Sequence, residues 1–250
     1  MRDFHQPGRS AVFATDGMVA TSHPLAAEAA LDLLKRGGNA MDAAICGAVL
    51  LGIAEPQMTG IGGDCFVLYS RPGEGVTAVN GSGQAPAAAS AAALRDQGLS
   101  AVPEYSAHAV TVPGAINAFC HLSETQGKLG LDAILAPSIH YAEAGIPVAP
   151  RVAFDWPGDA AKLKGAARMH YLVNGKAPTP GMLFDAPGQA EVLRRVARDG
   201  ARAFYEGEVA EDMLAVLNAE GGLHTAADFA AVSHRSDAPV RGRYKARDLI

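Results

Sequence analysis

The stretch VNGSGQAPA, at residues 79–87, collects the side chains best suited to bind a small molecule. Asn80 and Gln84 carry amides and Ser82 carries a hydroxyl, so together they offer hydrogen-bond donors and acceptors. The glycines between them let the backbone approach a bound group closely. Three interpretations are open: a phosphate-binding loop, one wall of a substrate pocket, or a turn in which Asn and Ser bond only their own backbone.

Phosphate binding is the least favoured of these interpretations. Apart from the G-E-G of residues 73–75, the chain has G-x-G at residues 60–62 and 81–83, but neither continues to the G-x-G-x-x-G of dinucleotide-binding loops. Neither is followed by the G-K-[ST] of a Walker A loop, whose lysine contacts the phosphates. Glycines that allow a hairpin to turn tightly therefore explain the spacing better.

Other common catalytic patterns are also missing from the sequence. It contains no G-x-S-x-G, which disfavours a hydrolase with a nucleophile elbow. The eight histidines are scattered without H-E-x-x-H spacing, and Cys46, Cys65 and Cys120 form no C-x-x-C pair. We therefore predict neither a metal nor a cofactor, and we expect buried free thiols in a reducing compartment.

Composition limits the class of partner. The 250 residues carry a formal net charge of −5, with 49% hydrophobic and 19% charged residues. Such a chain can bury a large core, and its acidity argues against nucleic acid or an anionic membrane surface as a partner. The N-terminus lacks the apolar segment of a signal peptide, and no apolar run reaches the ~18 residues of a spanning helix. We expect a soluble, cytoplasmic protein, with Arg151, Arg194 and Arg195 on solvated helix faces.

The polar stretch follows two predicted strands, 65–70 and 76–81, joined by the turn RPGEG. Apolar periodicity and end signals predict helices on both sides of this hairpin, with Asn39 as an N-cap and Asp42 at the third helical position. The pattern favours one domain over residues 1–250, either α+β or layered α/β. The predicted helices lie between Pro24 and Gly37, between Asn39 and Pro56, and at 131–144, 151–168, 187–199 and 207–220; further strands are predicted within 11–19 and before Val112.

Motifs along nearly the whole chain resemble the γ-glutamyltranspeptidase family. They are, in order, GMVATSHPLA, GGNAMDAA, EPQMTGIGG, QAPAAA, VTVPGA, PSIHYAEAGIPV, FYEGEVAEDM and LHTAADFAAV. The resemblance implies an N-terminal-nucleophile (Ntn) hydrolase with an αββα sandwich, whose precursor cuts itself into two subunits. The new N-terminal threonine of the small subunit then attacks an amide carbonyl. Its α-amine acts as base, and glycine N–H groups stabilise the oxyanion.

The nucleophile that this resemblance implies has no counterpart in the chain. No threonine lies in a TTH-like segment, so the N-terminal threonine is expected downstream of Ile250. The chain is similar to the N-terminal part of a large subunit, an incomplete αββα sandwich without a catalytic residue, and alone it is expected to be inactive. Its expected partners are a small-molecule amide and its own small subunit after self-cleavage; a homo-oligomer of such heterodimers is left open.

Residues 80–86 depart from the glutamyl-transferring members, which read like DFREMAP and whose arginine grips the glutamyl α-carboxylate. Alignment on Ala85-Pro86 places Ser82 at that arginine's position, and losing such a contact costs about 1.5–3 kcal/mol of binding free energy. Three stretches, NGSGQAP, TSHPLA and TGIGGDCF, resemble the oxamate amidohydrolase branch more closely, which implies a small amide substrate. A γ-glutamyltransferase or glutathione hydrolase is the alternative, and a non-catalytic scaffold subunit is the alternative of another class. The predicted substrate-binding residues are Asn80, Ser82, Gly83 and Gln84.

Overall fold

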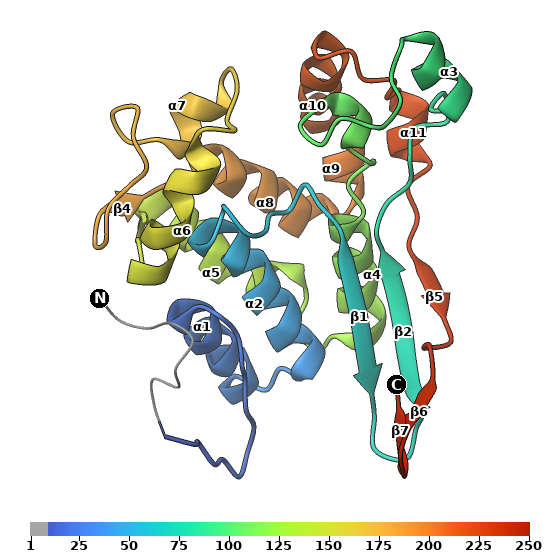
Figure 1. The fold of residues 1–250 in the computed structure, drawn as a ribbon. Helices are drawn as coiled ribbons and strands as arrows, with labels where there is room; N and C mark the ends of the chain where they lie inside the picture. The colour runs from blue at the N-terminus through green and yellow to red at the C-terminus, as the bar shows by residue number, and fades with distance from the viewer. Residues whose placement is uncertain (1–9) are drawn as a thin grey trace. The chain divides into compact units, whose positions relative to one another are not determined.

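The computed structural model describes residues 10–250 (Figure 1). Within that range the chain forms two compact units. The first contains the residues up to Gly60 together with Ser123–Arg198, and the second contains Ile61–Leu122 together with Asp199–Ile250. The single-domain organisation predicted for residues 1–250 stays a prediction.

The first unit consists mainly of helices, with one short two-stranded sheet. Helices α1 and α2 pack on each other, and α2 also packs on α5. The helices predicted at 131–144 and 187–199 are confirmed with those bounds. The elements are α1 Pro24–Lys35, α2 Ala40–Ala54, α5 Leu131–Ala144, β3 Ile146–Pro147, α6 Pro150–Ala160, α7 Ala167–Tyr171, β4 Leu183–Phe184 and α8 Pro187–Asp199, and β3 pairs antiparallel with β4.

The first two helices begin where the sequence predicts. Pro24 lies in the first turn of α1, and the His23 side chain caps this helix by accepting a hydrogen bond from the Leu25 amide at 3.3 Å. Asn39 caps α2: its side chain accepts from the Asp42 amide at 3.1 Å, and the Asp42 carboxylate accepts from the Asn39 amide at 2.8 Å. This capping box satisfies donors that the helix itself cannot pair, and so fixes its start.

Helix α2 is apolar on nearly all sides and lies in the core of the first unit, as predicted. Leu50 and Ile53 are fully buried in a cluster that includes Trp156 of α6 and Phe184 of β4. The rings of Trp156 and Phe184 meet edge to face with centroids 5.0 Å apart. Although α2 is so apolar, no helix in the described part of the chain is long and apolar enough to cross a membrane.

The second unit combines a three-stranded antiparallel sheet with short helices and a C-terminal hairpin. The strand order of the sheet is β1-β2-β5, and β6 pairs with β7 (Figure 1). The strands predicted at 65–70 and 76–81 are confirmed at both ends. The elements are β1 Cys65–Ser70, β2 Val76–Gly81, α3 Ala91–Asp96, the 3₁₀ turn η1 Ala107–Ala109, α4 Ala115–Gln126, α9 Arg202–Tyr205, α10 Glu208–Ala219, α11 Ala226–Ala230, β5 Arg235–Asp237, β6 Gly242–Tyr244 and β7 Arg247–Leu249.

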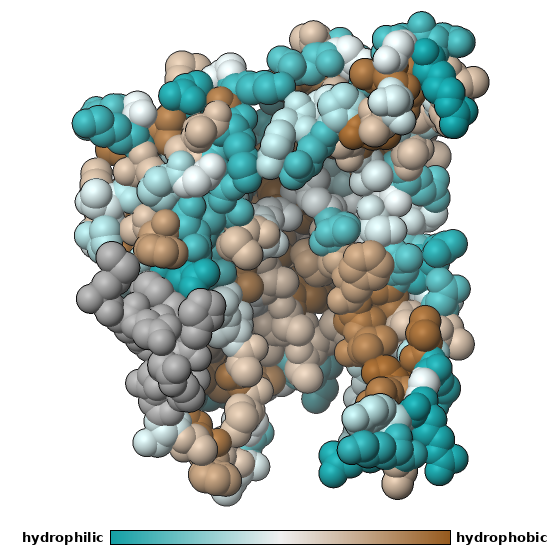
Figure 2. Space-filling view, viewed as in Figure 1, coloured by the Kyte–Doolittle hydropathy of each residue, from teal (hydrophilic) through white to brown (hydrophobic). Residues whose placement is uncertain are grey.

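The two faces of this sheet have different surroundings. On one face the sheet packs on α4: a Cβ atom built on Gly81 would lie 2.7 Å from the Cβ of Ala118 and 2.9 Å from the Sγ of Cys65. On the other face Phe66 and Leu68 of β1 are 68% and 58% exposed. Figure 2 shows hydrophobic side chains gathered over β1. The end of β2 therefore leaves the sheet close to α4, and its other face is rich in exposed apolar groups.

Three predicted elements are wrong. Residues 11–19 form no strand, because this exposed segment has no neighbouring strand to supply ladder hydrogen bonds. The strand predicted before Val112 is replaced by η1, whose hydrogen bonds are local, from the Ala109 amide to the Ser106 carbonyl and from the Val110 amide to the Ala107 carbonyl. The helix predicted at 151–168 is divided into α6 and α7 by a turn that includes Gly165, whose φ is +48°.

Candidate functional site

The predicted substrate-binding residues form a tight turn at the end of β2. The Asn80 side-chain oxygen accepts a hydrogen bond from the Ser82 amide at 2.9 Å, which is the local bond that a turn predicts. The Ser82 hydroxyl makes only a long contact, 3.4 Å, to the Gly83 carbonyl. Asn80 and Ser82 are half-buried, whereas Gln84 is exposed. The Asn80 side-chain oxygen is therefore occupied by the turn, while the Ser82 hydroxyl and the Gln84 side-chain amide make no close bonds to the turn.

The glycines of this turn are required by contact with another segment. Gly83 has a φ of +72°, and a Cβ atom there would lie 1.8 Å from the Val112 carbonyl oxygen. A Cβ atom on Gly114 would lie 2.3 Å from the Gly83 amide nitrogen and 2.4 Å from the Gly81 carbonyl oxygen. Because real Cβ atoms cannot approach backbone atoms so closely, both positions need glycine. The close approach is made by the protein's own backbone, so it gives no support to a phosphate loop.

Three motifs that are distant in the sequence meet at this turn. The Val112 amide donates to the Gln84 carbonyl at 2.8 Å. The amides of Gly114 and Ala115 donate to the Gly63 carbonyl at 3.0 and 3.1 Å. We refer to Gly63, residues 80–84 and residues 112–114 together as the three-segment cluster. Sequence reasoning pointed only to residues 80–84 as a site, and the substrate-binding role of Asn80, Ser82, Gly83 and Gln84 stays a prediction.

Tyr205 supports the three-segment cluster from behind. This side chain is 5% exposed, and its hydroxyl donates to the Pro113 carbonyl at 2.7 Å and accepts from the Asn117 amide at 3.0 Å. It therefore satisfies an unpaired donor in the first turn of α4 and fixes residues 112–114 at the same time. Burial raises the pKa of the Tyr205 phenol well above its usual value of 10.0. Sequence reasoning missed this residue because the motif FYEGEVAEDM gives no indication of a partner about 90 residues earlier.

The face of the sheet that packs on α4 also holds a pair of histidines. His234, the residue before β5, stacks on His121 of α4 with ring centroids 3.9 Å apart. The His234 ring nitrogen Nδ1 lies 2.8 Å from the Asn117 side-chain oxygen, and the His234 amide donates to the same oxygen at 3.0 Å. Burial, and then the neighbouring His121, lower the pKa of His234. Since successive strand residues point to opposite faces, Arg235 belongs to the face that lies away from α4.

Cys65 is not an activated thiol, and the described residues hold no grouped set of metal ligands. Burial, assisted by Asp64, raises the pKa of the Cys65 thiol to about 11, so little thiolate is present near neutral pH. Between residues 10 and 250, no three His, Cys, Asp or Glu side chains come together as metal ligands.

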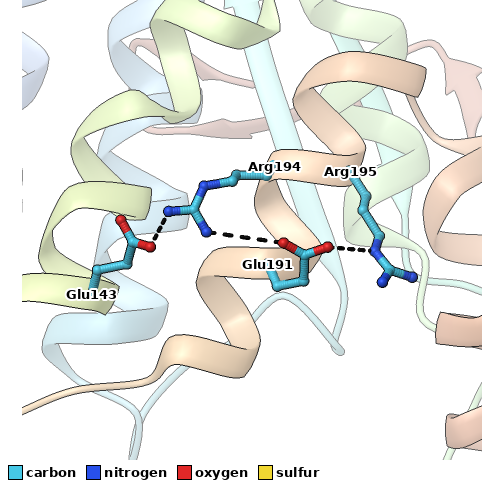
Figure 3. Close-up of polar contacts among 4 residues, drawn as sticks. All are labelled: Glu143, Glu191, Arg194 and Arg195. Atoms are coloured by element: carbon cyan, nitrogen blue, oxygen red, sulfur yellow. Dashed lines mark hydrogen bonds and ion pairs between the residues drawn. The ribbon is translucent and has the colours of Figure 1, made fainter.

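The arginines of α8 lie on a solvated face, as the sequence predicts. Arg194 forms ion pairs with Glu143 of α5 and with Glu191, and Arg195 forms a third with Glu191 at 2.8 Å (Figure 3). The hydrogen bond from Arg195 lowers the pKa of the Glu191 carboxyl, and the Glu191 side chain is 53% exposed. The guanidinium groups of Arg194 and Arg195 are thus paired with neighbouring surface carboxylates, and these contacts give no indication of an anion-binding site.

The first unit has a cavity of its own, of about 980 Å³, where the motifs TSHPLA and EPQM meet. The Ser22 hydroxyl donates to the Glu55 carboxylate at 2.7 Å, which joins the start of α1 to the end of α2. His23 lines the same cavity and is 3% exposed, and its burial lowers the pKa of its imidazole. These contacts explain the two motifs as a structural junction between helices.

Comparison with known proteins places this arrangement in a class. The crystal structure of cephalosporin acylase from Bacillus halodurans matches with a TM-score of 0.89 and 37% identity, over 97% of this chain and 47% of that one. Helicobacter pylori gamma-glutamyltranspeptidase matches with a TM-score of 0.89 and 26% identity, over 96% of this chain and 70% of that one. The chain thus has an α+β fold of the Ntn-hydrolase class, and the predicted fold class is confirmed.

The family follows from the sequence comparisons. The gamma-glutamyltranspeptidase family model matches residues 26–250, so this chain belongs to the gamma-glutamyltranspeptidase family. Bacillus subtilis glutathione hydrolase proenzyme is 32% identical over 92% of this chain, and the acylase ACY 1 proenzyme of Pseudomonas sp. strain SE83 is 35% identical over 94% of it. The chain covers 40% and 44% of the lengths of these two relatives. The resemblance of the motifs to this family is confirmed.

Proposed function

We propose that this chain is the large-subunit part of an N-terminal-threonine amidohydrolase that acts on a small amide such as oxamate. Relatives named as hydrolase and acylase proenzymes support amide hydrolysis after self-cleavage. The observation that carries the substrate class is Ser82. It occupies the position at which glutamyl-transferring members are expected to have an arginine, and its half-buried hydroxyl lies in a turn held on both sides by backbone contacts.

The proposed reaction uses groups from two subunits. The small subunit's threonine hydroxyl attacks the amide carbonyl and passes its proton to its own α-amine. The tetrahedral intermediate then collapses, the C–N bond breaks, and the nitrogen leaves as ammonia after taking up that proton. Water cleaves the resulting ester and restores the threonine. Residues 80–84 of this chain contribute by holding the rest of the substrate, so the chain alone releases no ammonia.

A γ-glutamyltransferase or glutathione hydrolase is the second candidate. The identity to Bacillus subtilis glutathione hydrolase proenzyme favours it, as does the match to Helicobacter pylori gamma-glutamyltranspeptidase. Against it stands the loss of a bidentate cation at position 82, because an unpaired glutamyl carboxylate would bind less tightly by about 1.5–3 kcal/mol. The cephalosporin acylase match makes a bulkier amide a further substrate to include in the test.

The test is a substrate comparison with the full-length protein that carries this chain. Ammonia release from oxamate and from glutamine is measured beside cleavage of a γ-glutamyl anilide and of a cephalosporin side-chain amide. We expect oxamate to be preferred, and Ser82→Arg to shift the preference toward the γ-glutamyl substrate. The matched control is Ser100→Arg, the same change at an exposed serine after α3. Preference for a γ-glutamyl substrate in the unaltered protein would refute the small-amide assignment.

The same preparation tests the scaffold alternative. The proposal requires the full-length protein to divide into two polypeptides, the smaller beginning with threonine, and to remain a complex of both. Gel electrophoresis and N-terminal sequencing detect this directly. An intact polypeptide with no activity on any of the four substrates would instead support a non-catalytic interaction subunit.

A further inference from the structure

We propose that Arg235 binds the carboxylate of the substrate and so takes the place of the cation that position 82 lacks. This inference rests on the proposed function, since it concerns the substrate-binding end of the same sheet. It begins from the register of the strands. In the β2–β5 ladder Asn80 lies directly opposite Arg235, and in the β1–β2 ladder Asn80 lies directly opposite Phe66.

These register positions form one row across the three strands. Residues directly opposite in an antiparallel ladder have side chains on the same face of the sheet. Phe66, Asn80 and Arg235 therefore share the face that lies away from α4. The next row on that face contains Leu68, Ala78 and Asp237. In these two rows the polar groups lie on β2 and β5, and the large apolar groups lie on β1.

Arg235 lies within reach of position 82. Two residues along a strand span about 7 Å and neighbouring strands are about 5 Å apart, so the α-carbons of Arg235 and of residue 82 would be roughly 8 Å apart if β2 ran straight past Gly81, where it ends. An extended arginine side chain covers that distance. The Asn80 side chain folds residue 82 back by bonding its amide at 2.9 Å, which keeps the Ser82 hydroxyl at the same end of the sheet.

The present partner of Arg235 leaves its guanidinium largely available. Its Nε lies 3.7 Å from the Asp237 carboxylate, and the two side chains are 70% and 59% exposed. An ion pair of that length and exposure contributes little to stability. A guanidinium presents a planar fork of donors that matches a carboxylate with two parallel hydrogen bonds. A substrate carboxylate, once shielded from water, would therefore be a better partner than Asp237.

A substrate whose carboxylate lies next to its amide tests this assignment of Arg235. The Ser82 side chain is neutral, so the cation comes from the neighbouring strand β5. Oxamate has one amide and one carboxylate on adjacent carbons, and oxamide is its neutral analogue with the carboxylate replaced by a second amide. Comparing oxamate with oxamide therefore shows whether a residue recognises the carboxylate charge or the amide group.

The experiment compares KM for oxamate and for oxamide in the full-length protein. We expect Arg235→Met to raise KM for oxamate by about tenfold or more, with kcat changed far less and oxamide unaffected. Arg235→Lys should restore part of the loss, because an ammonium keeps the charge without the fork. The control is Arg243→Met, the same change at an exposed arginine of β6. Equal effects on both substrates, or no effect on oxamate, would overturn the proposal.

Oxamate binding, measured by calorimetry, separates this proposal from the proposed function. If the unaltered protein hydrolyses neither substrate but binds oxamate, and Arg235→Met abolishes that binding, the amidohydrolase assignment fails and the role of Arg235 stands. If hydrolysis of oxamate is intact in Arg235→Met, the role of Arg235 is refuted and the amidohydrolase assignment stands. Because Arg235 is exposed, its variants should unfold at nearly the same temperature as the unaltered protein.

Discussion

Replacing Asp42 by alanine should be among the most destabilising single changes in the first unit. The carboxylate is completely buried, and it does more than complete the cap of α2. It accepts from the Asn39 amide at 2.8 Å and from the Lys128 amide at 3.0 Å, with the Leu129 amide at 3.4 Å. A residue at the start of one helix thus holds the backbone between α4 and α5, 86 positions later.

The expected loss can be worked out from these contacts. Alanine would remove the hydrogen bonds that the part-buried amides of Asn39 and Lys128 donate to a charged acceptor, and each such bond contributes about 1.5–3 kcal/mol. Weakening of the Leu129 contact and the void left by the carboxylate add to this, so the free energy of unfolding should fall by about 3–6 kcal/mol. Asn at position 42 keeps one acceptor oxygen, and its cost should be about half as large.

Urea unfolding of Asp42→Ala, Asp42→Asn and the unaltered chain, followed by circular dichroism, measures these differences. The matched control is Asp32→Ala on α1, where a carboxylate with 59% exposure lies 3.6 Å from Arg36 one turn away. That exposed pair should contribute less than about 0.5 kcal/mol. The structural role given to Asp42 is wrong if the free energies of unfolding of Asp42→Ala and Asp32→Ala differ by less than about 1 kcal/mol. This threshold is roughly the error of extrapolating the free energy of unfolding to zero urea.

Three further predictions follow from the same kind of argument. Gly83→Ala should cost at least about 2 kcal/mol, or prevent folding, because its Cβ would collide with the Val112 carbonyl; urea unfolding measures the loss. Burial lowers the pKa of His23 below 6.5, so on acidification the unfolded chain takes up the proton before the folded chain does. The free energy of unfolding, measured in urea, should therefore fall from about pH 7 to pH 5. The variant His23→Asn retains a good helix cap and should reduce this pH dependence. Burial raises the pKa of Cys46 to about 12 and of Cys65 to about 11, so both thiols should react slowly with Ellman's reagent at about pH 8 unless urea is added. Because these thiols lose their protons more readily in the unfolded chain, the free energy of unfolding should decline as the pH rises above 9.0.

Elements defined by local signals were predictable from the sequence. The capping box of Asn39 and Asp42 specifies where α2 begins, and Pro24 does the same for α1. Alternation and the turn between them specify β1 and β2. In each case the residues that determine the structure lie within a few positions of one another, so the bounds of the element can be predicted from the local sequence.

Long-range partners were not predictable in this way. Nothing near Asp42 in the sequence indicates that its carboxylate also binds the Lys128 amide, and nothing near Tyr205 indicates Pro113. The strand predicted within residues 11–19 failed for the same reason, because a segment with strand-forming residues needs a second strand from elsewhere in the chain. Composition describes what a segment can form, while tertiary contacts decide whether it does.

Some residues of the polar stretch at 80–84 are needed for the fold, whereas others are available to contact a substrate. Asn80 is explained by its bond to the Ser82 amide, Gly81 by contact with α4, and Gly83 by contact with the Val112 carbonyl. Each of these residues would be needed for the fold whatever the substrate. Only the Ser82 and Gln84 side chains lack close structural bonds of this kind, so substrate preference can change at these two positions without disturbing the turn. If this stretch binds the substrate, we expect the contacts to come from Ser82, from Gln84 and from Arg235, which lies opposite Asn80 on the neighbouring strand.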